Sequence, residues 1–347
     1  MSRGYPARGI GLAAIMAAGV GLSACSSSSS PSSTGTSSST ATSSASSPAA
    51  AAAGKNIELI VGTKSDDFYV TMECGAMAEA NKLGVHLTVN GPADFSVSEQ
   101  APILNAVAAA KPDALIVAPT SATALDPELQ RIQSGGTKLI FVDTDSSNTS
   151  LGLARITSDN VGGGKLAADS LAKAIGAKGT VAVINVQPGI STTDARIQGF
   201  NQEMAAKYPN IKVLPVQYDN DSAATAASQV EGDITAHPNL SGVFATNVLS
   251  AQGAATGVNH AGKSGKVKVA TFDADPQQMQ ALKSNTIQLA IAQDPYLEGQ
   301  DGVDQAVNAL TGKTVTPNIG TPLVAITQQN MTTPSVSKYV YVSSCSS

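Results

Sequence analysis

The stretch IELIVGTKSDDFYVTMECGAMAEANKLG, residues 57–84, contains the repeating unit on which the fold is built. It opens with the short apolar run IELIVGT, which is typical of a buried strand. The segment MECGAMAEANKLG then places apolar residues at a spacing of three to four and ends on Gly84, which predicts a helix. Two acids and two aromatic rings, Asp66 to Tyr69, stand between these segments. The stretch therefore predicts a strand, a helix, and a polar and aromatic junction between them.

The same alternation of apolar runs and helical segments continues to about Thr327. The predicted strands cover residues 57–63, 86–91, 114–119, 138–144, 153–159, 180–186, 211–218, 242–247, 267–273, 287–294 and 322–327. Strands that are apolar throughout, each followed by a helix, indicate a parallel sheet with helices on both faces. So many units exceed one doubly wound sheet, because a single core stops growing at about 250–300 residues. The pattern predicts an α/β protein of two lobes.

The first residues have the composition of an export signal. Arg3 and Arg8 precede a short apolar segment, residues 10–22. This segment is too short to span a bilayer comfortably, since a spanning helix needs about 20 apolar residues. Basic residues before it and small residues after it predict a signal peptide over residues 1–24.

The sequence LSAC that ends this segment resembles a bacterial lipobox, which implies that Cys25 is acylated and becomes the new N-terminus. The alternative is an ordinary secretory signal with a chance cysteine. Residues 25–54 are rich in Ser, Thr and Ala, with nothing large to bury, so we expect a flexible tether. A lipid and a tether would hold the folded part at the outer side of a membrane.

The charge balance excludes some classes of partner. Removal of Arg3 and Arg8 with the signal changes the formal net charge from −5 to −7. An acidic chain without basic clusters argues against a nucleic acid or an anionic lipid surface as partner.

Cysteine and histidine are sparse. Beyond the acylated residue, Cys74 and Cys345 remain, and they either form a disulfide that joins the tail to the first helix or stay as two thiols. The histidines His86, His237 and His260 are scattered, without a zinc-binding or metalloprotease pattern. We expect no metal, no cofactor and no catalytic residue.

Polar and aromatic residues gather where the predicted strands end. They are Asp66, Asp67, Phe68, Tyr69, Asp143, Asn247, Asp273, Gln293 and Asp294, with Arg196 near the start of a helix. Ligands of open α/β sheets bind outside the carboxyl ends of the strands. Carboxylates and amides make directed hydrogen bonds, and a ring can cover an apolar C–H face, so this set suits a hydroxyl-rich ligand.

The run 159–165, DNVGGGK, has two interpretations. A phosphate loop would need a different spacing, with Ser or Thr where Leu166 stands. The favoured interpretation is close helix packing near a hinge.

The order of several motifs resembles the ribose-binding type of periplasmic solute-binding protein, the receptor of bacterial sugar ABC importers. The motifs are DDFYVTMECGAMAEANKLG, IFVDT, ITSDNVGGGKLAAD, DARIQGF, ITAHPNLSGVFATN, VATFDADP and LAIAQDPYLEGQ. The resemblance implies two Rossmann-like lobes with parallel sheets covered by helices, joined by a hinge of three crossings near 157–159, 290–293 and 321–323. The first lobe would comprise 55–157 and 293–321, and the second 158–292 and 322–347.

The resemblance also implies roles for the residues at the strand ends. Phe68 and Tyr69 would stack on the sugar, although an aromatic pair after a strand is otherwise often core. The residues that would hydrogen-bond the sugar are Asp66 and Asp143 in the first lobe, Arg196, Asn247 and Asp273 in the second, and Gln293 at a hinge. Asp67 is expected to be the N-cap of the first helix.

The chain departs from the ribose binders at several positions. The doubled acid Asp66-Asp67 replaces Asn-Pro, Ala118 replaces Asn, and Thr144 replaces Arg. The ring that closes the far side of the sugar aligns with Asn220 or Asp221, which with Thr144 are further candidate contacts. We therefore expect another pentose, a hexose or a sugar alcohol rather than ribose.

The resulting hypothesis is a monomeric binding protein, anchored only by lipid, which passes its ligand to an ABC permease and its ATPase. The alternatives are a sensor of the same fold and, less favoured, a secreted enzyme acting on glycosides, which paired carboxylates could support.

Overall fold

The computed structural model describes residues 51–345. The predicted signal peptide, Cys25 and most of the predicted tether lie outside these residues. The last part of that tether does not: Ala52 is fully buried, and the Gly54 amide donates to the Gly84 carbonyl over 3.0 Å. The fold therefore begins before Lys55, because Ala52 already packs into the hydrophobic core despite its small side chain.

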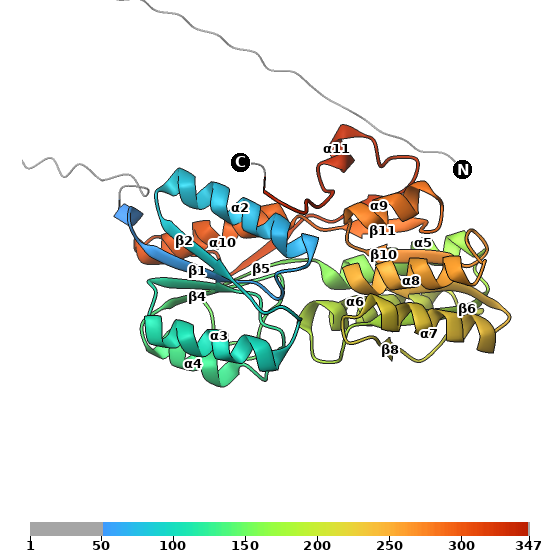
Figure 1. The fold of residues 1–347 in the computed structure, drawn as a ribbon, viewed down its shortest axis with the longest axis horizontal. Coiled ribbons are helices and arrows are strands. Elements are labelled where there is room, and N and C mark those ends of the chain that lie inside the picture. Colours follow the sequence, from blue (N-terminus) through green and yellow to red (C-terminus); the bar gives the residue numbers. More distant parts are fainter. Residues whose placement is uncertain (1–50, 346–347) are drawn as a thin grey trace, which may run out of the picture. The chain divides into compact units, whose positions relative to one another are not determined.

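The first lobe is built on one fully parallel sheet. Its strands are β1 (Asn56–Ile60), β2 (His86–Asn90), β3 (Ala114–Val117), β4 (Lys138–Val142), β5 (Ala154–Ser158) and β12 (Asn318–Thr321), in the order β12-β5-β4-β3-β1-β2. Helices α2 (Asp67–Leu83) and α10 (Pro295–Leu310) pack together on one face (Figure 1). Helices α3 (Val97–Ala110) and α4 (Asp126–Ser134) cover the other face.

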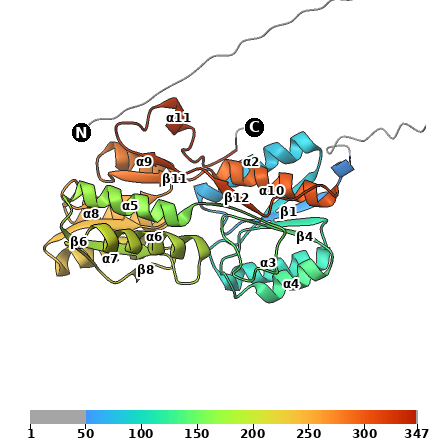
Figure 2. The ribbon, with the colours of Figure 1, turned by 180° about the vertical axis from the view of Figure 1, so that it is seen from behind.

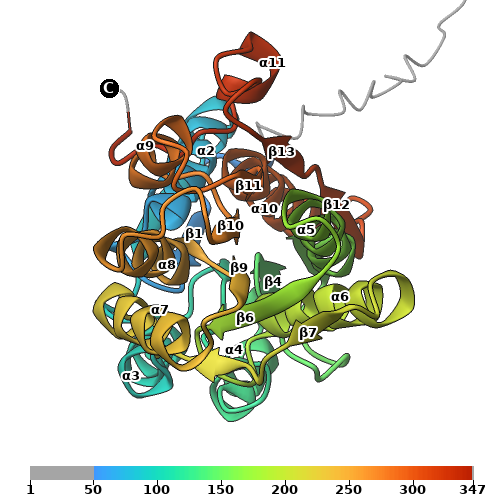
Figure 3. The same ribbon diagram turned by 90° about the vertical axis from the view of Figure 1, so that its right-hand side faces the viewer.

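The second lobe repeats this plan. Its strands are β6 (Gly179–Asn185), β7 (Ile211–Val213), β8 (Gln217–Tyr218), β9 (Leu240–Ala245), β10 (Lys268–Phe272), β11 (Leu289–Ala292) and β13 (Val324–Ile326). The strand order is β13-β11-β10-β9-β6-β7, with β8 paired to β6. The end-on view shows α5 (Asn160–Ala174) and α6 (Ser191–Lys207) on one face (Figure 3). The other face carries α7 (Ala223–Ala236), α8 (Val248–His260) and α9 (Pro276–Lys283).

The structure corrects three strand predictions. The predicted strand 211–218 is two short strands, because Pro215 between them has no amide hydrogen to donate. Strand β12 was missed, since Asn, Gly and Thr leave its four residues with little apolar pattern. Strand β13 runs antiparallel to β11, because the chain enters the second lobe through residues 322–323 at the edge of the sheet where β11 ends, so that Val324 pairs with Ala292.

The chain passes between the two sheets three times. It crosses at Asp159 between β5 and α5, at residues 293–294 between β11 and α10, and at residues 322–323 between β12 and β13. The view from behind shows these connections running side by side between the lobes (Figure 2). The short helix α11 (Pro334–Ser337) follows β13.

The end of the tail does not stay with the second lobe, where residues 322–347 were expected. Cys345 forms a disulfide with Cys74 on α2, and Ser343 donates to Asp67 at the start of that helix. Of the two states that the sequence left open for these cysteines, the structure has the disulfide.

Candidate ligand-binding site

A cavity lies where the carboxyl ends of the strands of both lobes meet. Its lining includes the eight residues that the strand-end argument and the resemblance favoured, together with Thr144 and Asp221. The full lining is Asp66, Phe68, Tyr69, Phe95, Asp143, Thr144, Val186, Ile190, Thr192, Thr193, Arg196, Asp221, Asn247, Asp273 and Gln293. Asn220 is not in this lining and borders a neighbouring surface hollow instead.

One wall of the cavity is aromatic. Phe68 and Tyr69, in the first turn of α2, are 4% and 5% exposed, and their rings meet edge to face at 5.1 Å. Phe95 lies nearly parallel to Tyr69, with ring centroids 6.5 Å apart. Gly62 lies directly against these rings. An added Cβ there would collide with Phe95 and Tyr69, so only glycine fits at this position. Phe95 was missed, although its position shortly after β2 fits the same strand-end argument.

The N-cap of α2 is Asp66, not Asp67 as predicted. The Asp66 carboxylate accepts a hydrogen bond from the Phe68 amide over 2.8 Å. Asp67 is the first helical residue and accepts from the Ser343 hydroxyl. The helix therefore begins one residue earlier than predicted, because a doubled Asp offers two equivalent N-cap candidates in the sequence.

Asp143 directly follows β4 and faces the aromatic wall. The Tyr69 hydroxyl donates to its Oδ2 over 2.7 Å, and Asp143 is 7% exposed. Burial raises the pKa of Asp143 to about 6, while the Arg196 charge and the Tyr69 hydrogen bond act in the opposite direction. The Thr144 hydroxyl donates a hydrogen bond to the Pro119 carbonyl over 2.8 Å.

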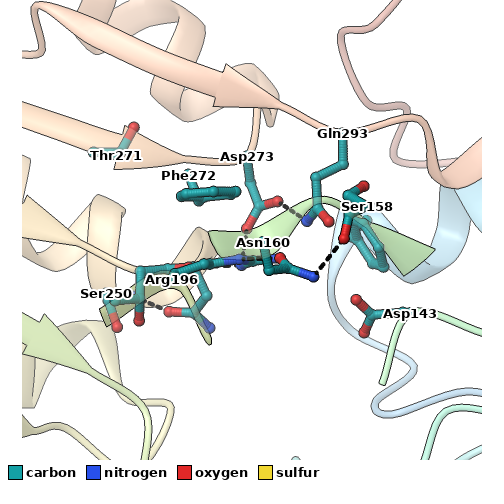
Figure 4. Close-up of polar contacts among 12 residues, drawn as sticks. Asp143, Ser158, Asn160, Arg196, Ser250, Thr271, Phe272, Asp273 and Gln293 are labelled. Atoms are coloured by element: carbon teal, nitrogen blue, oxygen red, sulfur yellow. Dashed lines mark hydrogen bonds and ion pairs between the residues drawn. The ribbon is translucent and has the colours of Figure 1, made fainter. Parts of the chain in front are cut away.

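Arg196 stands in the second turn of α6, where four partners hold its guanidinium. Nε donates to Asn160 Oδ1 over 2.8 Å, and Nη1 donates to the Thr246 carbonyl over 2.7 Å. The guanidinium carbon lies 4.1 Å from the centre of the Phe272 ring, and Nη1 is 3.9 Å from Asp273 Oδ2. These contacts fix the guanidinium plane at the cavity (Figure 4).

The packing of α5 against α6 sets the position of this arginine. An added Cβ on Gly164 would collide with the Arg196 carbonyl, and one on Gly199 would collide with the Val161 carbonyl. Asp159 caps α5 by accepting from the Gly162 amide over 2.9 Å. Gly164 of the run 162–164 therefore serves close helix packing, as favoured from the sequence, whereas a Cβ on Gly163 would meet the Phe272 side chain.

Asp273 directly follows β10 in the second lobe, as Asp143 follows β4 in the first. The amide of each donates over 2.8 Å to the neighbouring strand, Asp143 to Ile156 and Asp273 to Ile291. Both residues have positive φ, 56° for Asp143 and 73° for Asp273. Each lobe thus presents one acid in the same local setting.

A small network surrounds the Asp273 carboxylate. The Gln293 side chain donates to Oδ1 over 2.7 Å, and the Tyr341 hydroxyl donates to the same atom over 2.9 Å. Within residues 51–345, the buried Oε1 of Gln293 has no hydrogen-bond partner, so it can accept from a ligand hydroxyl. Tyr341 was missed, because no sequence pattern connects it with residues so distant along the chain.

Asn247 joins the cavity from the start of α8. Its Oδ1 caps the helix by accepting from the Ser250 amide, and its Nδ2 donates to Asp221 over 2.7 Å. Asp221 lines the cavity together with the apolar side chains of Val186 and Ile190.

Carboxyl groups dominate the charge of the cavity. Four line it, Asp66, Asp143, Asp221 and Asp273, against the single guanidinium of Arg196. Burial raises the pKa of Asp66, and the nearby Asp273 charge raises it further. Burial also raises the pKa of Asp221 and of Asp273. Such a site disfavours an anion and suits a neutral ligand whose hydroxyls donate.

Residues 51–345 contain no group of three or more His, Cys, Asp and Glu side chains that could hold a metal ion. No helix in this part of the chain is long and apolar enough to cross a membrane.

Two α/β lobes with hydrogen-bonding groups and rings at their facing strand ends define a two-lobed solute-binding protein. The chain belongs to the periplasmic binding protein family, whose domain matches residues 57–314. It is 30% identical over 278 residues to the ribose import binding protein of Escherichia coli (strain K12), covering 80% of this chain and 92% of that protein.

Solved structures of similar proteins carry bound sugars. A solute binding protein of an ABC transporter from Agrobacterium vitis, bound with α-D-tagatopyranose, is 43% identical, with a TM-score of 0.81 over 83% of this chain and 99% of that chain. A carbohydrate transporter solute binding protein from Agrobacterium radiobacter, in complex with D-arabinose, is 32% identical, with a TM-score of 0.80 over the same shares. These matches confirm the family and the fold expected from the sequence.

Proposed function

We propose that the protein captures an uncharged monosaccharide or sugar alcohol between its lobes, outside the cytoplasm, and delivers it to an ABC permease and its ATPase. The observation that carries the proposal is the pairing of the Phe68–Tyr69 wall with acceptors from both lobes. The rings suit the C–H face of a sugar, and the acids and amides suit its hydroxyls.

Binding is coupled to closure of the lobes. The lobes contact each other beside the cavity, where the Ala122 amide donates to the Gly189 carbonyl and the Asp145 amide donates to the Ser191 hydroxyl, each over 2.9 Å. A ligand that touches Asp143 and Arg196 at once can do so only when the lobes are together. It therefore favours the closed state through its differential affinity, without any chemical change.

The ligand is neutral and differs from ribose. Asp66 and Asp221 add carboxylates to the cleft, so sugar acids and sugar phosphates are excluded by charge. Similar proteins bind a ketohexose and an aldopentose, which supports ligands of that size. Thr144 replaces an arginine of the ribose binders. The smaller side chain leaves more room in the cleft and removes a hydrogen-bond donor from its first-lobe side.

The N-terminal segment completes the proposal. An acylated Cys25 and the Ser-rich tether would keep the protein beside its permease as a monomer. Labelling with a fatty-acid probe tests this: Cys25→Ala should lose the label and leave the membrane fraction. Retention of the variant in that fraction would contradict lipid anchoring.

A thermal-shift screen tests the binding function. We expect D-tagatose, D-arabinose, D-allose or xylitol to raise the melting temperature, because a ligand at about 100 times its Kd adds about 2.7 kcal/mol of stability. Phe68→Ala and Asp273→Ala should abolish the shift. Met77→Ala, which removes an exposed apolar side chain from the same helix as Phe68, should keep it. Stabilisation by an amino acid or peptide, with none by a carbohydrate, would contradict the proposal.

A further inference from the structure

The end of the chain forms a connection between the lobes in addition to the three crossings. The Tyr341 amide donates to the Ala274 carbonyl of the second lobe over 3.0 Å. The Val342 amide donates to the Thr71 hydroxyl on α2 over 2.9 Å. Three residues further on, Cys345 is bonded to Cys74 of α2, and Figure 1 shows this segment lying beside that helix. We call residues 341–345 the strap.

Tyr341 is the residue of the strap that reaches the binding residues. It is 2% exposed, and its hydroxyl accepts from the Gln293 amide over 3.1 Å while it donates to Asp273. The ring meets Phe68 edge to face, with centroids 5.6 Å apart. One side chain therefore touches Asp273 and Gln293 on one side of the cleft and Phe68 on the other.

We propose that the strap, anchored by the Cys74–Cys345 disulfide, is part of the ligand-binding machinery, and that Tyr341 is a positioning residue which orients Asp273 and Phe68 for the ligand. This inference rests on the proposed function for its effect on affinity. The arrangement of the strap itself can be tested without any ligand.

The contacts explain why the strap couples the lobes. If the lobes separate, the strap cannot keep its bond to Ala274 and its covalent bond to α2 unless Tyr341 moves with one lobe and leaves the other. Separation would then remove the hydroxyl from Asp273 or the ring from Phe68. The closed arrangement alone satisfies both, so an intact strap favours closure and presents Asp273 ready to bind.

The Tyr341 hydroxyl is tested by Tyr341→Phe, with Tyr339→Phe, two residues before the strap tyrosine, as the matched control. We expect Tyr341→Phe to weaken binding of D-tagatose or D-arabinose about tenfold in calorimetry, and Tyr339→Phe to change it less than twofold. The Tyr341 bond lowers the pKa of Asp273, so its loss should also move the acid fall-off of affinity to higher pH. Equal affinities and equal pH profiles in the two variants would overturn the positioning role.

The anchor is tested by the double variant Cys74→Ser/Cys345→Ser. In the ligand-free protein, hydrogen exchange should become faster at the amides of Tyr341 and Val342. In the wild type, the hydrogen bonds of these amides to the Ala274 carbonyl and the Thr71 hydroxyl slow their exchange. Reduction of the wild type should do the same, and reoxidation should reverse it. Unchanged exchange at these amides would refute the proposal that the disulfide anchors the strap. If exchange changes as expected but no sugar binds either protein, the strap stands and the proposed function fails.

Discussion

Replacement of Asp143 by Asn should stabilise the ligand-free protein while weakening its binding. Burial raises the pKa of Asp143 from 3.8 to about 6, so at neutral pH the folded protein holds a carboxylate in a setting that favours the protonated form. Over that interval of about two pH units, at 1.36 kcal/mol per unit, the ionised group costs about 3 kcal/mol of stability. Asn is neutral, and its carbonyl oxygen can still accept from the Tyr69 hydroxyl.

The gain depends on pH with a defined sign. A raised folded pKa means that the stability from this group is present below pH 3.8 and is lost as the pH rises through about 6. Asp143→Asn should therefore match the wild type near pH 4 and exceed it at pH 7.5. At roughly 2 °C per kcal/mol, the melting temperature at pH 7.5 should rise by about 6 °C.

Differential scanning calorimetry of the ligand-free proteins at both pH values measures this effect. Asp94→Asn, the same substitution at an exposed loop position, is the control and should show no gain. The reasoning is refuted if Asp143→Asn melts lower than the wild type at pH 7.5, or if its gain is the same at pH 4. Calorimetric titration with the sugar found in the screen should show weaker binding, since the variant offers one acceptor oxygen instead of two.

Three further outcomes follow from the cleft. Sugar affinity of the wild type should fall as the pH drops below about 6, because Asp143 protonates and stops acting as a pure acceptor; titrations at pH 5 and 7.5 check this. Phe68→Ala should cost about 3 kcal/mol of stability in denaturant unfolding, as usual for a buried aromatic residue, with binding lost; full stability would contradict its place in the core. Arg196→Lys should lose the bonds to Asn160 and Thr246 together and weaken binding at least tenfold, although the charge remains; unchanged affinity would argue against a fixed guanidinium.

The strand ends explain why much of the site could be predicted. In a parallel sheet the carboxyl ends share one edge, so residues that close apolar runs, such as Asp143 and Asp273, are placed near one another by topology alone. The family resemblance then selected among these residues and gave a ligand role to Arg196, which lies inside a helix rather than at a strand end. Asp66 and Asp67 show the limit of this reasoning, because the start of a helix is uncertain by a residue.

The rest of the site depends on contacts that no local pattern encodes. Thr192 and Thr193 reach the cavity from the first turn of α6, and the position of that turn depends on how α6 packs on α5. Tyr341 reaches the cavity residues Asp273 and Phe68 from a tail without a regular pattern, held by a disulfide whose partners are 271 residues apart. Strand β12 was not predicted although it pairs regularly with β5, because its residues NIGT have almost no apolar pattern.

The left-handed backbone at Asp143 and Asp273 limits how such a cleft can evolve. Among residues with a side chain, Asp and Asn tolerate positive φ best, whereas branched or bulky residues there are strained. Mutation at these two positions can therefore exchange an acid for an amide, or remove the group with Gly, but can hardly introduce a new shape. New ligand preferences in this lineage would have to arise from residues in ordinary conformations, such as Ala118, Thr144 and Val186, while the two acids persist.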